Sequence, residues 1–234
     1  MFFSLLRWSA NALVAILIAS TVSECRAEVA ATPTATEIVE QMRVHNQART
    51  AGLKHLKSTR HYEVEYRGFS TTIAARMNVE YEFDATTGKS FRIVSQSGSK
   101  LLLEKVLKRA IDSEKEASQD KALTALSPAN YRFHLAGSEN LAGRLTYILD
   151  VDPIEKSKFL YRGKIWVDAA DFALVKIEAE PAKSPSFWIA RTLIRQSFAK
   201  TGNYWLPAQN RSETKVRIGG TAVLTIDYGS YQIE

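Results

Sequence analysis

Strict alternation of apolar and polar residues is the clearest pattern in this chain, and it begins after Leu56. Tyr62, Val64 and Tyr66 are separated by charged residues, and the same period runs through residues 73–83. A period of two is typical of strands that bury one face. A turn at residues 86–89 leads into a third strand at residues 90–97, which predicts a three-stranded meander. Six residues are expected to share its concave, buried face: Tyr62, Val64, Tyr66, Met77, Val79 and Tyr81.

Two segments have the helical period instead. The first begins at Thr34-Ala35-Thr36-Glu37, which has the Thr-x-x-Glu spacing of a capping box, and continues to about Thr50. The second begins near residue 100 and is followed by a more polar helical piece at residues 114–126, which Ser127-Pro128 ends. The apolar face of this second helix comprises Leu102, Leu103, Val106, Leu107, Ala110 and Ile111.

The C-terminal half of the chain consists of further strand patterns separated by turn residues. Strands are predicted at residues 131–136, 144–151, 158–168, 172–180, 188–200, 204–216 and 222–233. Short connections between antiparallel neighbours are predicted at residues 137–143, 168–171, 201–203 and 219–220. A total of about ten strands, with helices confined to the N-terminus and the middle, indicates an α+β fold. Its architecture is expected to be a strongly curved antiparallel sheet or open barrel with helices on one face.

The first thirty residues differ from the rest of the chain. Residues 12–22 are almost entirely apolar, and small residues stand at Cys25 and Ala27, as at a signal-peptidase site. We therefore predict that residues 1–27 are a signal peptide and that residues 28–234 form a single domain. An uncleaved anchor is the weaker alternative, because the apolar run has about half the length of a spanning helix.

Cys25 is the only cysteine of the chain. Attachment of a lipid to it is disfavoured, because Glu24 stands where a lipoprotein signal needs a small residue. Cleavage after Ala27 would leave a mature chain without cysteine, and hence without disulfides or thiol chemistry.

Composition and charge exclude other classes of protein. Of the 234 residues 45% are hydrophobic, as in globular proteins, and the net charge of +6 is spread among 25 acidic residues, so no nucleic-acid partner is expected. The four histidines lack ligand spacing and no catalytic or cofactor motif occurs, so no metal, cofactor or enzyme activity is predicted. A carboxylate pair is the weaker alternative, and its candidates are Asp150, Asp152, Asp168 and Asp171. Their positions at strand ends and turns favour hydrogen bonds to local backbone.

Four segments carry a resemblance to a known family: Arg162–Asp168, Asp171–Ile177, Gly202–Pro207 and Leu224–Tyr228. They give a strand ending in Trp-Val-Asp, a turn, an apolar strand and a Tyr-Trp-Leu-Pro strand. This series resembles the C-terminal strands of the outer-membrane lipoprotein-sorting proteins, the LolA/LolB-like superfamily. It is also similar to the N-terminal domain of envelope stress regulators of the RseB/MucB type. The resemblance implies an unclosed β-barrel, with helices covering the open side and a helical lid over a hydrophobic cavity for acyl chains.

The function implied by this resemblance is that of a soluble periplasmic carrier of lipid or lipoprotein acyl chains, for transport toward the outer membrane. Its partners would be that cargo and an inner- or outer-membrane protein, and the carrier would be a monomer. A lipid-sensing or scaffolding module and an envelope hydrolase are the alternatives. The middle helix is either a mobile lid or part of a solid core. The residues expected to bind the ligand are Tyr62, Val64, Tyr66, Met77, Val79, Tyr81, Leu103, Val106, Leu107, Ile111, Tyr147 and Leu149.

Overall fold

The computed structural model describes residues 32–119, 121–184, 186–217 and 219–234. Pro33–Glu234 forms one compact unit, and the fold below is the fold of that unit. The predicted signal peptide, residues 1–27, lies outside the described residues, so its presence and cleavage stay predictions. Of the helices described, none has both the length and the apolarity that crossing a bilayer requires.

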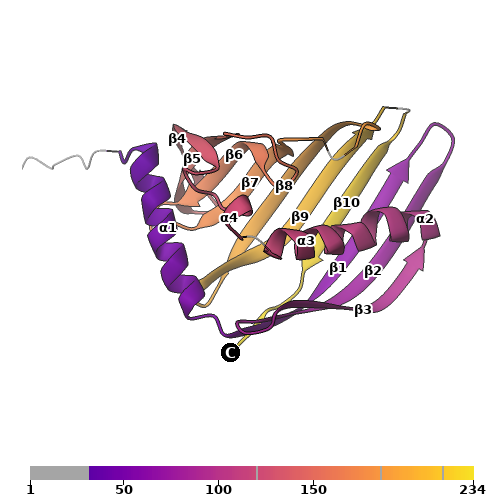
Figure 1. The fold of residues 1–234 in the computed structure, drawn as a ribbon, viewed down its shortest axis with the longest axis horizontal. Helices are drawn as coiled ribbons and strands as arrows, with labels where there is room; N and C mark the ends of the chain where they lie inside the picture. Colours follow the sequence, from indigo (N-terminus) through magenta and orange to yellow (C-terminus); the bar gives the residue numbers. More distant parts are fainter. Residues whose placement is uncertain (1–31, 120, 185, 218) are drawn as a thin grey trace, which may run out of the picture. The chain divides into compact units, whose positions relative to one another are not determined.

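The described residues build one antiparallel sheet of eleven strands, whose order is β3-β2-β1-β10-β9-β8-β7-β6-β5-β4, with the short β11 paired to β1. The strands are β1 (His55–Arg67), β2 (Thr72–Asp84), β3 (Gly88–Gly98), β4 (Tyr131–Leu141), β5 (Arg144–Pro153), β6 (Tyr161–Asp168), β7 (Leu174–Pro181), β8 (Ile189–Thr201), β9 (Tyr204–Val216), β10 (Thr221–Tyr228) and β11 (Gln232–Ile233). β3 and β4 end the order without pairing to each other, so the sheet is curved but unclosed (Figure 1). The predicted fold class is therefore confirmed.

Cross-strand register places the predicted inward residues on one face of the sheet. Tyr62 lies opposite Met77 and Val64 lies opposite Ala75, and directly opposed residues of antiparallel strands point to the same side. Five of the six residues predicted to face inward are buried, and Tyr66 is half-buried. The predicted register of the meander is therefore confirmed. We call this face, which the helices cover, the inner face.

The described helices are α1 (Ala35–Ala51), α2 (Lys100–Leu102), the π-helical turn η1 (Leu103–Leu107), α3 (Lys108–Gln119) and α4 (Lys121–Thr124). The predicted capping box of α1 is present, since Thr34 N donates to Glu37 Oε2 at 2.7 Å and Glu37 N donates to Thr34 Oγ1 at 3.3 Å. α2, η1 and α3 together form the predicted middle helix. The piece predicted at residues 114–126 is instead the end of α3 followed by the short α4.

Several strand boundaries differ from the prediction, among them that of β6, which begins at Tyr161 and not at residue 158. Residues 137–143 do not form a simple connection, because a bulge between Leu135 and Gly137 lets β4 continue to Leu141. The strand predicted at residues 222–233 is interrupted and divides into β10 and β11. β7 begins at Leu174, since Phe172 has a φ of 45° and belongs to the preceding turn.

Two apolar clusters lie at opposite ends of the sheet. In the first, which we call the α1 cluster, Ile38 packs with Leu149 and Ile177 of β5 and β7. In the second, the α3 cluster, Leu107 packs with Val64 of β1. Figure 1 shows α1 beside β4 to β7 and the run from α2 to α3 lying over the opposite end. Each end of the sheet therefore has its own covering helix.

Both clusters lie on the inner face, as the register shows. Val64 lies directly opposite Leu224, and Leu224 lies opposite Ser212. Ser212 lies opposite Ile194, which in turn lies opposite Ala179, so that five neighbouring strands each contribute one residue to this face. Val64 belongs to the α3 cluster and Ala179 to the α1 cluster. The two helices therefore cover the same side of one continuous sheet.

Between the two clusters, the inner face carries polar side chains on β8 and β9. The Oγ1 atoms of Thr192 and Thr214 are 3.0 Å apart, and Asn210 Nδ2 donates to Gln196 Oε1 at 3.3 Å. Ser212 Oγ donates to Asn210 Oδ1 at 3.1 Å. These half-buried side chains form a hydrogen-bonded row between the two apolar clusters.

Candidate functional site

A cavity of about 640 Å³ lies on the inner face, where the end of α1 meets β1, β2, β9 and α3. Its size is within the usual range for small-molecule sites. The apolar residues that line it are Ala51, Leu53, Leu56, Phe83, Ala85, Leu206 and Pro207. Its polar lining consists of Gln47, Thr50, Arg60, Tyr81, Lys89, Glu114 and Tyr231. We call this space the Arg60 cavity.

Arg60 occupies a buried position on the inner face of β1. Leu56, Ser58 and Arg60 alternate with exposed residues and are all buried, and Arg60 is only 3% exposed. A guanidinium removed from water in this way needs a counter-charge. Its Nη1 donates to Glu114 Oε2 at 2.7 Å, and Lys89 Nζ donates to Glu114 Oε1 at 2.9 Å. β1, β3 and α3 therefore each contribute one charged side chain to the cavity.

The charges of this cluster stabilise one another. Burial alone would lower the pKa of Arg60, but the attraction of Glu114 outweighs burial and raises the pKa above its ordinary value. Burial would raise the pKa of Glu114, whereas Arg60 and Lys89 hold it below its ordinary value. At neutral pH the described lining thus carries two positive charges and one negative charge.

Aromatic rings surround the guanidinium of Arg60. Its Cζ lies 3.6 Å from the ring centroid of Tyr81, 4.9 Å from that of Tyr228 and 5.3 Å from that of Phe91. Burial raises the pKa of the Tyr81 hydroxyl to about 12 and also raises the pKa of Tyr231. These hydroxyls therefore remain protonated at neutral pH, and that of Tyr231 donates to the carbonyl oxygen of Pro207 at 2.7 Å.

Two buried polar atoms on the inner face of β1 have no hydrogen-bond partner among the described residues. They are Nε of Arg60 and Oγ of Ser58. Folded proteins satisfy nearly all buried polar groups, because an unpaired one loses its hydration without compensation. The unpaired Nε of Arg60 is therefore an unsatisfied donor on a residue that lines the cavity.

A second cavity, of about 720 Å³, lies between α1, residues 125–127 and the strands β7 to β9. Its lining combines apolar side chains such as Leu126 and Phe198 with the cations of Arg43 and Arg49. Gln47 and Thr50 line this cavity as well as the Arg60 cavity. The two spaces therefore meet along the last turns of α1.

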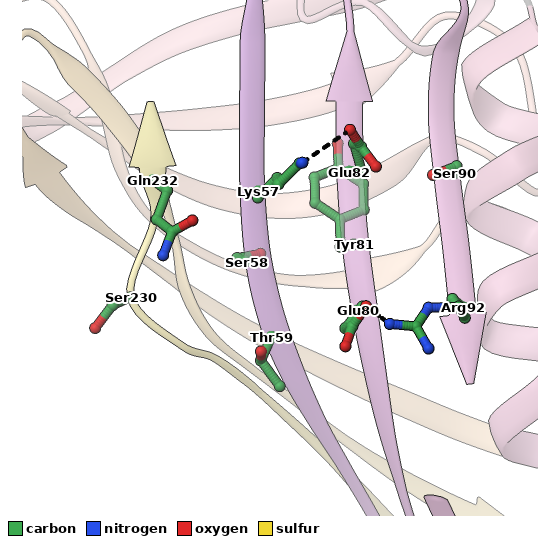
Figure 2. A pocket seen from close by; sticks show the side chains of 10 residues that line it. All are labelled: Lys57, Ser58, Thr59, Glu80, Tyr81, Glu82, Ser90, Arg92, Ser230 and Gln232. Carbon is green, nitrogen blue, oxygen red and sulfur yellow. Dashed lines mark hydrogen bonds and ion pairs between the residues drawn. The ribbon is translucent and has the colours of Figure 1, made fainter. Parts of the chain in front are cut away.

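A third depression, of about 360 Å³, is polar and is drawn in Figure 2. Lys57 and Glu82 pair across β1 and β2 at 3.4 Å, and Arg92 pairs with Glu80. These four side chains are well exposed and already form ion pairs, whose stabilising effect in water is small. This depression offers no apolar surface comparable to that of the Arg60 cavity.

The structure brings most of the twelve predicted site residues together. Nine of them belong to the α3 cluster, where helix and sheet pack directly against each other. Tyr81 is buried on the same face and alone among the twelve lines the Arg60 cavity. Tyr147 and Leu149 lie in the α1 cluster at the other end of the sheet. The charged residues Arg60, Lys89 and Glu114 are absent from the predicted set.

The acidic residues that were considered as a carboxylate pair are all neutralised by basic side chains. Ion pairs join Asp150 to Lys164, Asp152 to Arg162, Asp168 to Arg144 and Asp171 to Lys200, at 2.5 to 2.7 Å. Asp168 also accepts hydrogen bonds from the backbone N–H groups of Ala170 and Asp171, as expected for a turn residue. In the part of the chain that the structure describes, no three metal-ligating side chains come together.

No protein-family model matches this sequence, and no curated protein matches it significantly. Three solved structures have a similar fold. A DUF1329 family protein from Desulfovibrio piger ATCC 29098 is 14% identical, with a TM-score of 0.44 over 87% of this chain and 94% of its own. A putative outer membrane lipoprotein-sorting protein domain from Vibrio parahaemolyticus is 12% identical, with a TM-score of 0.42 over 86% and 93%.

The third is a LolA superfamily protein from Nitrosomonas europaea, which is 13% identical, with a TM-score of 0.39 over 87% of this chain and 94% of its own. At such low identities these similarities concern the fold alone. Two of these three proteins are described as a lipoprotein-sorting domain and a LolA superfamily protein.

Proposed function

We propose that this protein is a carrier that holds an acyl chain of a lipid or lipoprotein in the Arg60 cavity. The observation that supports this proposal is an apolar space on the inner face of an unclosed sheet, bounded by α1 on one side and by Glu114 of α3 on the other. The resemblance of the C-terminal strands to lipoprotein-sorting proteins supports the same class of ligand.

Transfer of an acyl chain into such a space is favourable. Each methylene group removed from water contributes about 0.8 kcal/mol, so a long chain supplies on the order of ten kcal/mol before ordering costs. The lining groups Leu53, Leu56, Phe83 and Leu206 offer the apolar surface that this transfer requires. The adjoining second cavity would accommodate a longer or a second chain.

Export to the periplasm is part of the proposal and rests on residues 1–27. We expect the mature chain to begin at Glu28 and to carry no lipid, which intact-mass measurement of protein from its own envelope tests. A diacylglyceryl group on Cys25 would overturn this. Mass spectrometry of solvent extracts from the same sample would identify the cargo, whereas a stable protein partner without lipid would support a sensing or scaffolding role.

The acyl-binding proposal is tested by filling the cavity. Ala51 lines it at the last turn of α1, so we expect Ala51→Trp to weaken binding of a fluorescent long-chain fatty acid by about tenfold or more, since it occupies the space of several methylenes. Ala48→Trp on the same helix is the matched control, because Ala48 is exposed like Ala51 but does not line the cavity, so the change should leave binding unaltered. If the wild-type protein binds no acyl probe at micromolar concentration, the proposal is wrong.

A further inference from the structure

We propose that the Arg60 cavity selects amphiphiles that carry an oxyanion, a carboxylate or a phosphate, at the end of the acyl chain, and that Arg60 binds this oxyanion. The inference rests on the proposed function, because it assigns a headgroup to the ligand of the same cavity. It concerns the buried charge in the cavity, which binding of an acyl chain alone does not explain.

The guanidinium of Arg60 has unused donor capacity. It offers five N–H donors in a planar fork, and Nη1 is engaged by Glu114 at 2.7 Å. Nε has no partner among the described residues, although the side chain is only 4% exposed. A carboxylate or phosphate that enters the cavity would therefore find a buried, charged donor that is already held in place.

The charge of the cavity favours an anion over a neutral headgroup. Among the described lining residues, Arg60 and Lys89 are cationic and Glu114 is anionic, so one positive charge is left without an opposite charge in the lining. Electrostatic attraction is stronger here than at the surface, because burial removes the screening by water. An oxyanion would neutralise the excess charge.

The neighbours of Arg60 hold its guanidinium in place. Glu114 accepts a hydrogen bond from Nη1 and leaves Nε unpaired. The guanidinium Cζ lies 3.6 Å from the ring centroid of Tyr81 and 4.9 Å from that of Tyr228, and contact with these rings restricts the movement of the guanidinium. Next to the charge, Leu56 and Phe83 supply apolar wall, so headgroup and chain meet different surfaces of one cavity.

The experiment compares three ligands of equal chain length: dodecanoate, dodecyl phosphate and dodecan-1-ol. Each displaces a bound fluorescent acyl probe at neutral pH, at concentrations where all three are monomeric. We expect the wild-type protein to bind at least one of the two anions about tenfold more tightly than the alcohol, as for a hydrogen bond to a charged group. The anion that binds more tightly shows whether the site prefers a carboxylate or a phosphate headgroup.

Arg60→Gln should remove the preference for the anion while leaving binding of the alcohol unchanged. The matched control is Arg76→Gln, since Arg76 pairs with Glu63 on the exposed outer side of the same strand pair, at 2.7 Å. Because loss of a buried charge can unfold the chain, Glu114→Gln provides a second test. It removes the competing carboxylate, so affinity for the anions should rise and affinity for the alcohol should not.

The outcomes separate the two proposals. Equal binding of all three ligands by the wild-type protein would overturn the oxyanion site and leave the acyl cavity in place. A preference that persists in Arg60→Gln, or an anion affinity that does not rise in Glu114→Gln, would overturn it as well. If none of the three ligands binds, the proposed function itself fails, and the oxyanion site fails with it.

Discussion

Replacement of Leu107 by alanine tests whether the middle helix belongs to the core. Leu107 lies in η1, is 0% exposed and packs in the α3 cluster with Val64 and Met77. Leu101 lies one helical segment earlier but is 60% exposed, so Leu101→Ala is the matched control. The two variants lose the same atoms from the same helical run and differ in burial.

The magnitude follows from this difference. Deleting a fully buried leucine side chain costs about 2–5 kcal/mol, because it removes apolar contacts and leaves a cavity. For a domain of this size, each kcal/mol lowers the melting temperature by about 2–4 °C. A loss of about 3 kcal/mol in Leu107→Ala would therefore lower it by roughly 6–12 °C. Leu101→Ala should change the free energy of unfolding by less than about 0.5 kcal/mol.

The assay is chemical denaturation of both variants, together with binding of the fluorescent fatty acid. The structure predicts that Leu107→Ala greatly lowers the free energy of unfolding, as expected for a helix that completes a solid core. If that free energy falls by less than about 1 kcal/mol while acyl binding changes, this reasoning is refuted and the helix is a lid that leaves the sheet easily.

Three further predictions concern other parts of the fold, each measured by the free energy of unfolding. Thr34→Ala removes the capping box shared with Glu37 and should cost about 1 kcal/mol, whereas an unchanged value would mean that the cap is dispensable. Gly163→Ala should cost on the order of 2 kcal/mol or more, because φ is +155° and a Cβ would lie 2.3 Å from the carbonyl oxygen of Glu178. Burial opposes ionisation of Asp168, but the hydrogen bonds that it accepts hold its pKa below the ordinary value. Its contribution to the free energy of unfolding is therefore full above about pH 5 and is lost as the pH falls. Asp168→Asn should therefore flatten the loss of stability on acidification, and an identical pH dependence in both proteins would contradict this assignment.

The general fold could be predicted because its signals are local. The pair Thr34 and Glu37 marks the start of α1, and the alternation at residues 62–66 determines which face of β1 is buried. The boundaries that differ depend on partners distant in the sequence. β4 continues past Gly137 because β5 resumes pairing beyond the bulge, and no pattern within β4 itself indicates that.

The candidate site was less predictable. The alternation that includes Tyr62 extends backward to Arg60, so an arginine in an inward position was visible in the sequence. Its counter-ion Glu114 is 54 residues away and is brought to it only by the packing of α3. Tyr147 and Leu149 were grouped with the other site residues because alternation predicts the face of a strand, not its distance along the sheet.

The position of α1 has a consequence for the time at which the chain can fold. Arg49 at the end of this helix donates hydrogen bonds to the carbonyl groups of Asp171 and Phe172, which lie 122 and 123 residues later. β1, likewise, pairs with β10, for example Val64 with Leu224, 160 residues later. The packing of α1 therefore waits for the residues that follow β6, and the pairing of β1 waits for β10. Such distant pairing predicts slow folding, over milliseconds to seconds, during which the apolar side of α1 stays open to chaperones.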